Sequence, residues 1–145
     1  MGAKALMRVI LDTNVLLGAL ISPHGFPEKI YRAWRTGHFE LVTSTTQLDE
    51  LRRASRYPKL RAILPAHRVG AMVNNMQRAF VMNRLQALPD GISSHDPDDA
   101  FLPAMALESE ADYLVTGDRR AGLLEQANVK RTRILTPAAF CVEVL

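Results

Sequence analysis

Short apolar runs alternate with amphipathic stretches along the chain, and this alternation constrains the fold more than any other feature. The runs at residues 8–11, 39–43, 84–88, 112–116 and 133–136 predict strands, and the stretches between them predict helices. Strands that alternate with helices form right-handed crossovers, which produce a parallel sheet covered on both faces. We therefore expect a three-layer α/β/α fold with a central parallel sheet. The 145 residues fit one domain over 1–145, because two separate cores would each be small.

Two of the predicted helices carry specific expectations. Residues 66–80 show an apolar stripe at helical spacing, made of Val69, Met72, Val73, Met76 and Phe80. Met adapts to irregular surroundings, so the stripe fits the core or a subunit contact, and we favour the core. The other helix is expected to open at residues 96–99 and to run to residue 107. Pro103 would lie inside it without an N–H to donate, so this helix should kink or begin late.

The composition excludes several classes of protein. With 48% hydrophobic and 23% charged residues, the chain is neither a disordered tail nor a coiled coil. The longest apolar run, residues 9–21, is broken by Asp12 and Asn14 and falls short of the roughly 20 residues of a membrane span. Cys141 is the only cysteine, so an intramolecular disulfide is impossible. We expect a cytoplasmic protein that does not bind a membrane.

Positive and negative charges are segregated along the chain. Residues 51–89 contain eight Arg or Lys and no acid, whereas residues 90–118 contain eight acids and no Arg or Lys. Separate blocks suit a protein that gathers cations at one place and binds a polyanion beside it. They equally suit helices whose exposed faces happen to carry one sign, and the pattern alone does not decide between these interpretations.

Four acids stand where the predicted topology would bring them to one edge of the sheet. Asp12 follows the first predicted strand, and Asp118 follows the fourth. Glu50 and Asp99 stand early on predicted helices. Ligands of open parallel sheets bind beyond the carboxyl ends of the strands. Four carboxylates in one crevice repel one another unless a cation compensates them, and an all-oxygen ligand set selects Mg²⁺ or Mn²⁺. Such an ion can activate water and neutralise charge on a phosphate, so the pattern favours phosphodiester hydrolysis.

Each of these acids also has an ordinary structural interpretation. Asp12 would cap a helix, Asp118 fits turn chemistry, and Asp99 suits the dipole at the start of its helix. Glu50 alone would often be a solvated helix residue. Its neighbour Asp49 points roughly 100° away around the helix, so only one of the two should reach a site. The four histidines show no spacing typical of zinc ligands.

Four motifs, in this order and separation, resemble those of PIN-domain proteins. They are Leu11-Asp12-Thr13-Asn14-Val15-Leu16, the segment 44–51 with Glu50-Leu51, the segment 96–106 that opens with Asp96-Pro97-Asp98-Asp99, and Ala111-Asp112-Tyr113-Leu114-Val115-Thr116-Gly117-Asp118. The resemblance extends from about residue 7 to the terminal helix. The chain is most similar to the PIN-family toxin components of bacterial toxin–antitoxin systems, relatives of VapC-type toxins.

The resemblance implies a function and its partners. It implies a PIN-like fold with Rossmann-like winding and a nuclease domain that spans the chain. It also implies a ribonuclease that depends on Mg²⁺ or Mn²⁺ and cuts single-stranded RNA. Proteins of this kind are usually homodimers, and a cognate antitoxin protein silences them.

The resemblance also assigns residues to the site. The acidic quartet of the family falls on Asp12, Glu50, Asp99 and Asp118. Our hypothesis is that Asp12, Asp99 and Asp118 hold the metal, while Glu50 binds a second ion or positions the attacking water. Residues in supporting positions are Asp96, Asp98, Asn14 and Thr116. Candidate contacts to RNA phosphates are Arg52, Arg53, Arg119 and Arg120.

Two departures from the family, Pro103 inside its helix and the segment after the last motif, and two alternative functions stay open. Many relatives show Lys-Asp-Leu-Leu after the last motif, where this chain has Arg119-Arg120-Ala121-Gly122, so an optional acid is missing. The chain could therefore be a catalytically degenerate PIN module that binds RNA or a protein partner. A HAD-type phosphatase also has Asp after its first strand, but it needs a second Asp where this chain has Asn14.

Overall fold

The fold is built on one six-stranded sheet, seen in a computed structural model that describes residues 6–86, 100–117, 124 and 127–145. Within these residues the strand order is β3-β2-β1-β4-β6-β5. The strands are β1 (Arg8–Leu11), β2 (Glu40–Ser44), β3 (Phe80–Met82), β4 (Tyr113–Val115), β5 (Asn128–Val129) and β6 (Thr132–Leu135). Neighbouring strands are parallel except β5 and β6, which form an antiparallel hairpin at one edge. The predicted central parallel sheet is confirmed.

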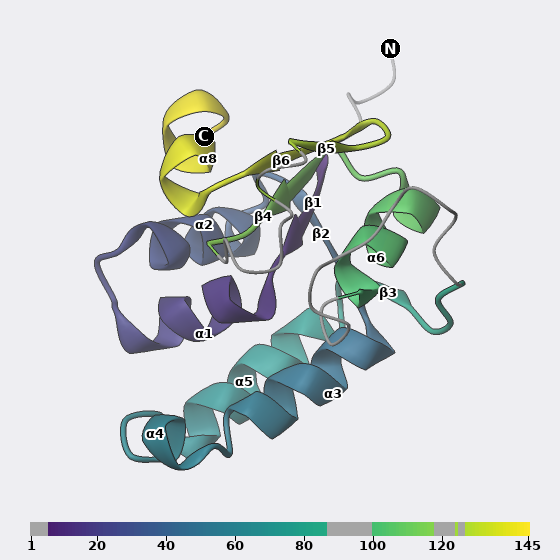
Figure 1. The fold of residues 1–145 in the computed structure, drawn as a ribbon. Coiled ribbons are helices and arrows are strands. Elements are labelled where there is room, and N and C mark those ends of the chain that lie inside the picture. Colours follow the sequence, from purple (N-terminus) through teal and green to yellow (C-terminus); the bar gives the residue numbers. More distant parts are fainter. Residues whose placement is uncertain (1–5, 87–99, 118–123, 125–126) are drawn as a thin grey trace.

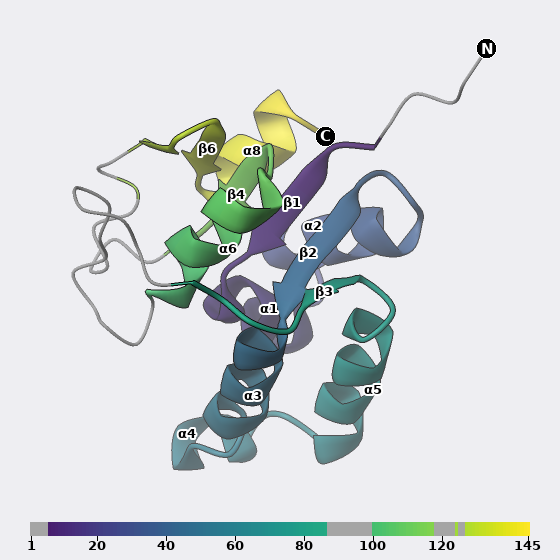
Figure 2. The ribbon, with the colours of Figure 1, turned by 90° about the vertical axis from the view of Figure 1, so that its right-hand side faces the viewer.

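Helices cover both faces of the sheet, which gives the predicted three layers (Figure 1). On one face lie α1 (Thr13–Ile21), α2 (Phe26–Arg35) and α8 (Pro137–Glu143), and on the other lies α6 (Phe101–Ser109). An arm made of α3 (Thr45–Ala54), α4 (Pro58–Arg61) and α5 (Ala66–Met76) projects from the carboxyl end of β2, with α4 at its tip (Figure 2). Within the described ranges, no helix combines the length and the apolar character that a membrane crossing requires.

Alternating residues of the central strands supply two apolar layers. In β1, Val9 and Leu11 pack into the larger cluster, which takes in residues of the α1, α2, α3, α5 and α8 helices. Ile10 lies between them in sequence but packs with Leu102 and Met105 of α6 on the opposite face. Successive residues of a strand face opposite sides, so a strand buried on both sides is a continuous apolar run. This is why the short apolar runs predict these strands.

The predicted helix over residues 66–80 is longer than the helix that forms. Helix α5 ends at Met76, and Phe80 begins β3, whose backbone pairs with β2 from Val42 onward. Phe80 continues the helical spacing only by coincidence, since it is 40% exposed on the edge strand. The other members of the stripe, Val69, Met72, Val73 and Met76, are buried, which confirms their place in the core. The strand predicted at 84–88 is wrong for residues 84–86, which follow β3 without joining the sheet.

Helix α6 begins at Phe101, later than the start at 96–99 that the sequence predicts. Pro103 is therefore the third residue of the helix, where backbone N–H groups have no acceptor within the helix. The missing N–H of Pro103 therefore costs no helical hydrogen bond. Of the two predicted effects, a kink or a late start, the structure confirms the late start. Residues 96–99 themselves lie outside the described part of the chain.

The β5–β6 hairpin gives no recognisable signal in the sequence. Lys130 and Arg131 connect the strands, and Lys130 has a φ of 52° in the left-handed region. Hairpins of this kind usually carry Asn-Gly or Asp-Gly, which this chain lacks here. An ion pair from Arg131 to Asp112, 2.7 Å long, ties the turn to the start of β4.

Candidate active site

Asp12 lies at the junction of β1 and α1, at the carboxyl end of the central strand. Its backbone N–H donates to the carbonyl of Val115 in β4 (2.9 Å), which continues the ladder between the two strands. Its own carbonyl accepts the first bonds of α1, from Val15 and Leu16. The residue is only 3% exposed. A carboxylate at such a position is costly unless hydrogen bonds or a positive charge compensate it.

Thr116 orients the Asp12 carboxylate from the neighbouring strand. It directly follows β4, is fully buried, and its hydroxyl donates to Asp12 Oδ2 over 2.6 Å. The backbone N–H of Thr116 donates to Leu135 of β6 (3.0 Å), so its position is fixed on both sides. Thr116 and Asp12 are 104 residues apart in the sequence. Because β1 and β4 are neighbouring strands of the sheet, the two side chains are nevertheless in contact.

Asn14 contributes its backbone rather than its side chain. Its N–H points to Asp12 Oδ1 at 3.4 Å, which makes Asp12 the N-cap of α1. The side chain of Asn14 is exposed at the same edge. The structural and functional interpretations of Asp12 therefore coexist, because the carboxylate caps α1 with one oxygen and accepts from Thr116 with the other.

Glu50, not Asp49, is the acid of α3 that turns inward. The side chain of Glu50 is 21% exposed and that of Asp49 is 75% exposed. Each pairs with an arginine one turn further along, Glu50 with Arg53 and Asp49 with Arg52. The two α3 arginines among the four predicted to contact RNA thus stand beside acids, and Arg53 adjoins the acid of the family quartet.

Gln47 is a residue of this region that sequence analysis missed. It is completely buried, its side-chain amide donates to the carbonyl of Leu11 (2.5 Å), and its side-chain oxygen accepts from the Thr43 hydroxyl (2.7 Å). Strand β2 pairs with β1 only as far as Ile10, so Gln47 satisfies the next carbonyl of β1 in place of a strand partner. Leu11 immediately precedes Asp12, and Glu50 lies one turn beyond Gln47 on the same side of α3.

A glutamine on the predicted apolar face of α3, three residues before a quartet acid, could have indicated a buried polar residue near the site. Glutamine is mostly exposed in proteins, and here it stands four residues before Leu51 and seven before Ala54, on the apolar face of α3. Its role depends on the end of the β1–β2 ladder, which the sequence does not reveal.

Several predicted site residues lie outside the described residues. They are Asp96, Asp98, Asp99, Asp118, Arg119 and Arg120. Of the predicted site, the structure therefore brings together Asp12, Asn14 and Thr116, and it links α3 to that point through Gln47. Among the described residues, no group of three His, Cys, Asp or Glu side chains could hold a metal ion. Two of the four quartet acids, Asp99 and Asp118, are not among the described residues.

Cys141 does not have the properties of a nucleophile. It lies on α8, half-buried, and burial raises the pKa of its thiol while the nearby charge of Lys29 partly opposes this. A raised pKa leaves less thiolate at neutral pH, and the thiolate is the reactive form.

The chain matches a known protein family over most of its length. A family model described as the PIN domain matches residues 8–120, which is most of the chain and includes every position of the acidic quartet. No curated protein matches the sequence significantly.

Proposed function

Because the chain belongs to the PIN-domain family, whose members are generally nucleases, we propose that it is a metal-dependent endoribonuclease that hydrolyses phosphodiester bonds of single-stranded RNA. The observation that carries the proposal is the buried Asp12 carboxylate at the carboxyl end of β1, oriented by Thr116. This is the end of a parallel sheet at which ligands bind. A divalent cation bound there would compensate the charge that burial makes costly.

Mg²⁺ or Mn²⁺ fits the donor atoms of this region. PIN domains usually use divalent metal ions. The acids of the quartet offer carboxylate oxygens, which are hard ligands, and no thiolate or imidazole belongs to the set. We propose that Asp12, Asp99 and Asp118 hold the ion. When bound, such an ion lowers the pKa of water and neutralises charge that develops on the phosphate.

The side chains of the chain orient the reaction. The Thr116 hydroxyl fixes the rotation of the Asp12 carboxylate, because it donates to one oxygen only. Glu50 positions the attacking water or binds a second ion, and the Arg53 guanidinium beside it is within reach of a substrate phosphate. In-line attack by water leaves a 5′-phosphate and a 3′-hydroxyl. The 2′-hydroxyl of the RNA is not a reactant.

The proposal extends to the biological role. The protein acts as the toxin of a toxin–antitoxin pair in the bacterial cytoplasm, as a homodimer that a cognate antitoxin protein silences. The support for this role is the similarity of its four motifs to those of PIN-family toxins.

Cleavage of labelled RNA by the Asp12→Asn variant tests the proposal. Asn is as good an N-cap as Asp, so α1 and the fold should survive the change. The loss of the negative oxygen should lower the cleavage rate by more than about 100-fold, since even outer-shell partners of a metal contribute about 10–100-fold. The assay uses a panel of single-stranded RNAs with Mg²⁺, Mn²⁺ or EDTA, and circular dichroism checks the fold.

Three results would contradict the proposal. Cleavage that persists in EDTA excludes a metal-dependent reaction. Products with 2′,3′-cyclic phosphates show that the 2′-hydroxyl is the nucleophile. RNA binding without turnover in any metal supports the alternative, a catalytically degenerate PIN module.

A further inference from the structure

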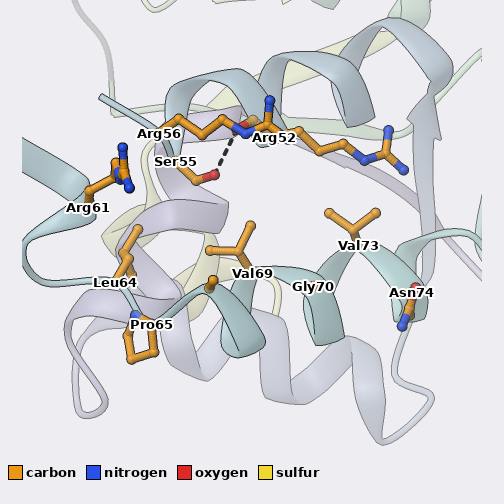
Figure 3. A pocket seen from close by; sticks show the side chains of 11 residues that line it. Arg52, Ser55, Arg56, Arg61, Leu64, Pro65, Val69, Gly70, Val73 and Asn74 are labelled. Carbon is orange, nitrogen blue, oxygen red and sulfur yellow. Dashed lines mark hydrogen bonds between the residues drawn. The ribbon is translucent and has the colours of Figure 1, made fainter. Parts of the chain in front are cut away.

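A groove with a positively charged rim runs between α3 and α5, beyond the candidate active site (Figure 3). It encloses about 820 Å³. Figure 3 shows Val69 and Val73 of α5 pointing toward α3, while Arg52 and Arg56 extend along the opposite wall. Arg61 of α4 closes one end. None of the described residues that line this groove is acidic.

The charges on the rim are largely uncompensated. Arg52 pairs with Asp49 at 3.2 Å. Within the described part of the chain, Arg56 and Arg61 form no ion pair, and both are exposed. Guanidinium groups present a fork of donors that matches carboxylate and phosphate oxygens. The ligand of this groove should therefore be anionic.

The floor of the groove argues against an apolar helix as the ligand. Leu64, Val69 and Val73 are each no more than 8% exposed, because they already pack in the core. An amphipathic helix would therefore find little apolar surface to bury, and apolar burial is what stabilises helix-in-groove contacts. Charge, not apolar area, is what this groove offers a ligand.

The position of the groove favours RNA over an acidic protein. Arg52 is two residues beyond Glu50 on α3, and Ala54 ends the helix only about 6 Å further along its axis than Glu50. Arg52 also lies about 200° around α3 from Glu50, so an RNA strand would pass around the helix, which is about 10–12 Å wide, to reach the groove a few nucleotides from the candidate active site. We propose that this groove holds the phosphate backbone of single-stranded RNA next to the cleaved bond, through Arg56 and Arg61. This inference rests on the proposed ribonuclease function.

The first test compares two double variants that remove the same charge. R56Q/R61Q removes two charges from the rim of the groove, whereas R68Q/R78Q removes two exposed arginines that do not line it, Arg68 on α5 and Arg78 just after that helix. Binding of fluorescent single-stranded RNA is measured by anisotropy in EDTA, so that no cleavage interferes. R56Q/R61Q should raise Kd about tenfold at about 200 mM salt and lower the slope of log K against log salt by about 1.4, or about 0.7 per lost phosphate contact.

The second test places a charge in the groove without touching an arginine. Gly70 lines the groove, and a Cβ there would meet nothing within 4 Å. Gly70→Glu should weaken RNA binding through repulsion, whereas Gly70→Ala should bind RNA like the wild type. Ala and Glu both favour the helical conformation of α5 more than Gly does, so we expect both variants to fold.

Binding and cleavage separate failure of this inference from failure of the proposed function. If R56Q/R61Q and R68Q/R78Q weaken RNA binding equally, the groove has no special role and the inference is wrong. The inference is also wrong if a labelled acidic peptide binds in an Arg56- and Arg61-dependent way while RNA binding is unchanged, since the groove would then be a protein-docking site. Loss of RNA binding in R56Q/R61Q without any RNA cleavage by the wild type would support the groove as an RNA-binding site and contradict only the proposed ribonuclease function.

Discussion

At the scale of single residues, the candidate site depends on side chains that form hydrogen bonds to more than one element. Asp12 caps α1 with one oxygen and accepts from Thr116 with the other. Gln47 likewise joins Leu11 of β1 to Thr43 of β2. Such two-sided bonding holds a buried polar group in one orientation, and it makes the removal of either partner costly.

The adjacent acids Asp49 and Glu50 allow a matched comparison at this scale. Glu50→Gln should lower kcat for RNA cleavage by about 100-fold, the usual contribution of a general base or water-positioning carboxylate. Asp49→Asn should change kcat by no more than about twofold, because its side chain is 75% exposed and faces away from the site. Initial rates at saturating RNA provide the measurement. Equal loss in both variants would show that the net charge of α3 matters and not the position of Glu50.

The Gln47 network makes a second residue-scale prediction. Gln47→Leu should lower the free energy of unfolding by about 1–3 kcal/mol, because the carbonyl of Leu11 and the hydroxyl of Thr43 lose their buried partner. It should also lower the cleavage rate by about tenfold, the size expected of an outer-shell group, since Leu11 precedes Asp12.

Thr43→Val is the control for Gln47→Leu. It removes only the bond to the Gln47 oxygen, so it should cost about 1 kcal/mol and leave the cleavage rate close to that of the wild type. Urea titrations and initial rates, measured below both unfolding midpoints, test the pair. If Thr43→Val slows cleavage as much as Gln47→Leu does, the hydrogen bond from Gln47 to Leu11 makes no contribution of its own to cleavage.

At the scale of elements, the arm of α3, α4 and α5 combines two functions in one pair of helices. The inner faces of α3 and α5 pack into the larger apolar cluster, whereas the outer ends present the arginines of the groove. The first turn of α3 lies beside Leu11, and Glu50 and Arg52 follow further along the helix, at a greater distance from the sheet. The arm therefore links the carboxyl end of β1 to a charged surface.

Met76→Ala tests whether α5 is held by its buried stripe. Met76 is fully buried at the end of α5, so its truncation should lower the free energy of unfolding by about 2–5 kcal/mol. Gln77→Ala changes the exposed neighbour and should cost less than about 0.5 kcal/mol. Both are measured by urea unfolding. A cost for Met76→Ala below 1 kcal/mol, as in the control, would mean that α5 is not part of the cooperative core.

At the scale of the whole molecule, one sheet couples two apolar layers. The α6 layer holds Ile10, Leu114 and Ile134, and the opposite layer holds their strand neighbours Leu11 and Val115. Strands β1, β2, β4 and β6 each contribute to both layers, so neither layer can lose its packing without disturbing the same backbone. We expect the described core to unfold in a single cooperative transition.

Leu114→Ala tests this coupling across the sheet. Leu114 lies in the α6 layer, whereas Trp34, the single tryptophan, packs against the other. The variant should lose about 2–5 kcal/mol, and the transitions seen by Trp34 fluorescence and by far-UV circular dichroism should shift together. If the unfolding midpoint seen by Trp34 fluorescence stays at the wild-type value while the midpoint seen by circular dichroism decreases, the two layers unfold independently.

The elements that the sequence predicted well are those whose burial pattern is local. β1, β2, β4 and β6 are apolar runs buried on both faces. Helix α2 has Pro27 in its first turn and α3 has Ser44 as its N-cap, and both are residue types that are typical of helix starts. The elements that it missed depend on distant partners. Phe80 joins β3 because β2 has an unpaired edge, and the β5–β6 turn closes without its usual residues.

The sequence by itself determined the order of strands and helices, the excess of charge on the arm and the acids that stand at strand ends, because periodicity, residue type and spacing are written along the chain. Only the tertiary structure decided that Thr116 orients Asp12 from 104 residues away, that Glu50 rather than Asp49 turns inward, and that Gln47 completes the end of β1. These relations arise when a parallel sheet brings distant strand ends together, and the partner of a buried polar group is then set by which backbone groups the neighbouring strands leave unpaired.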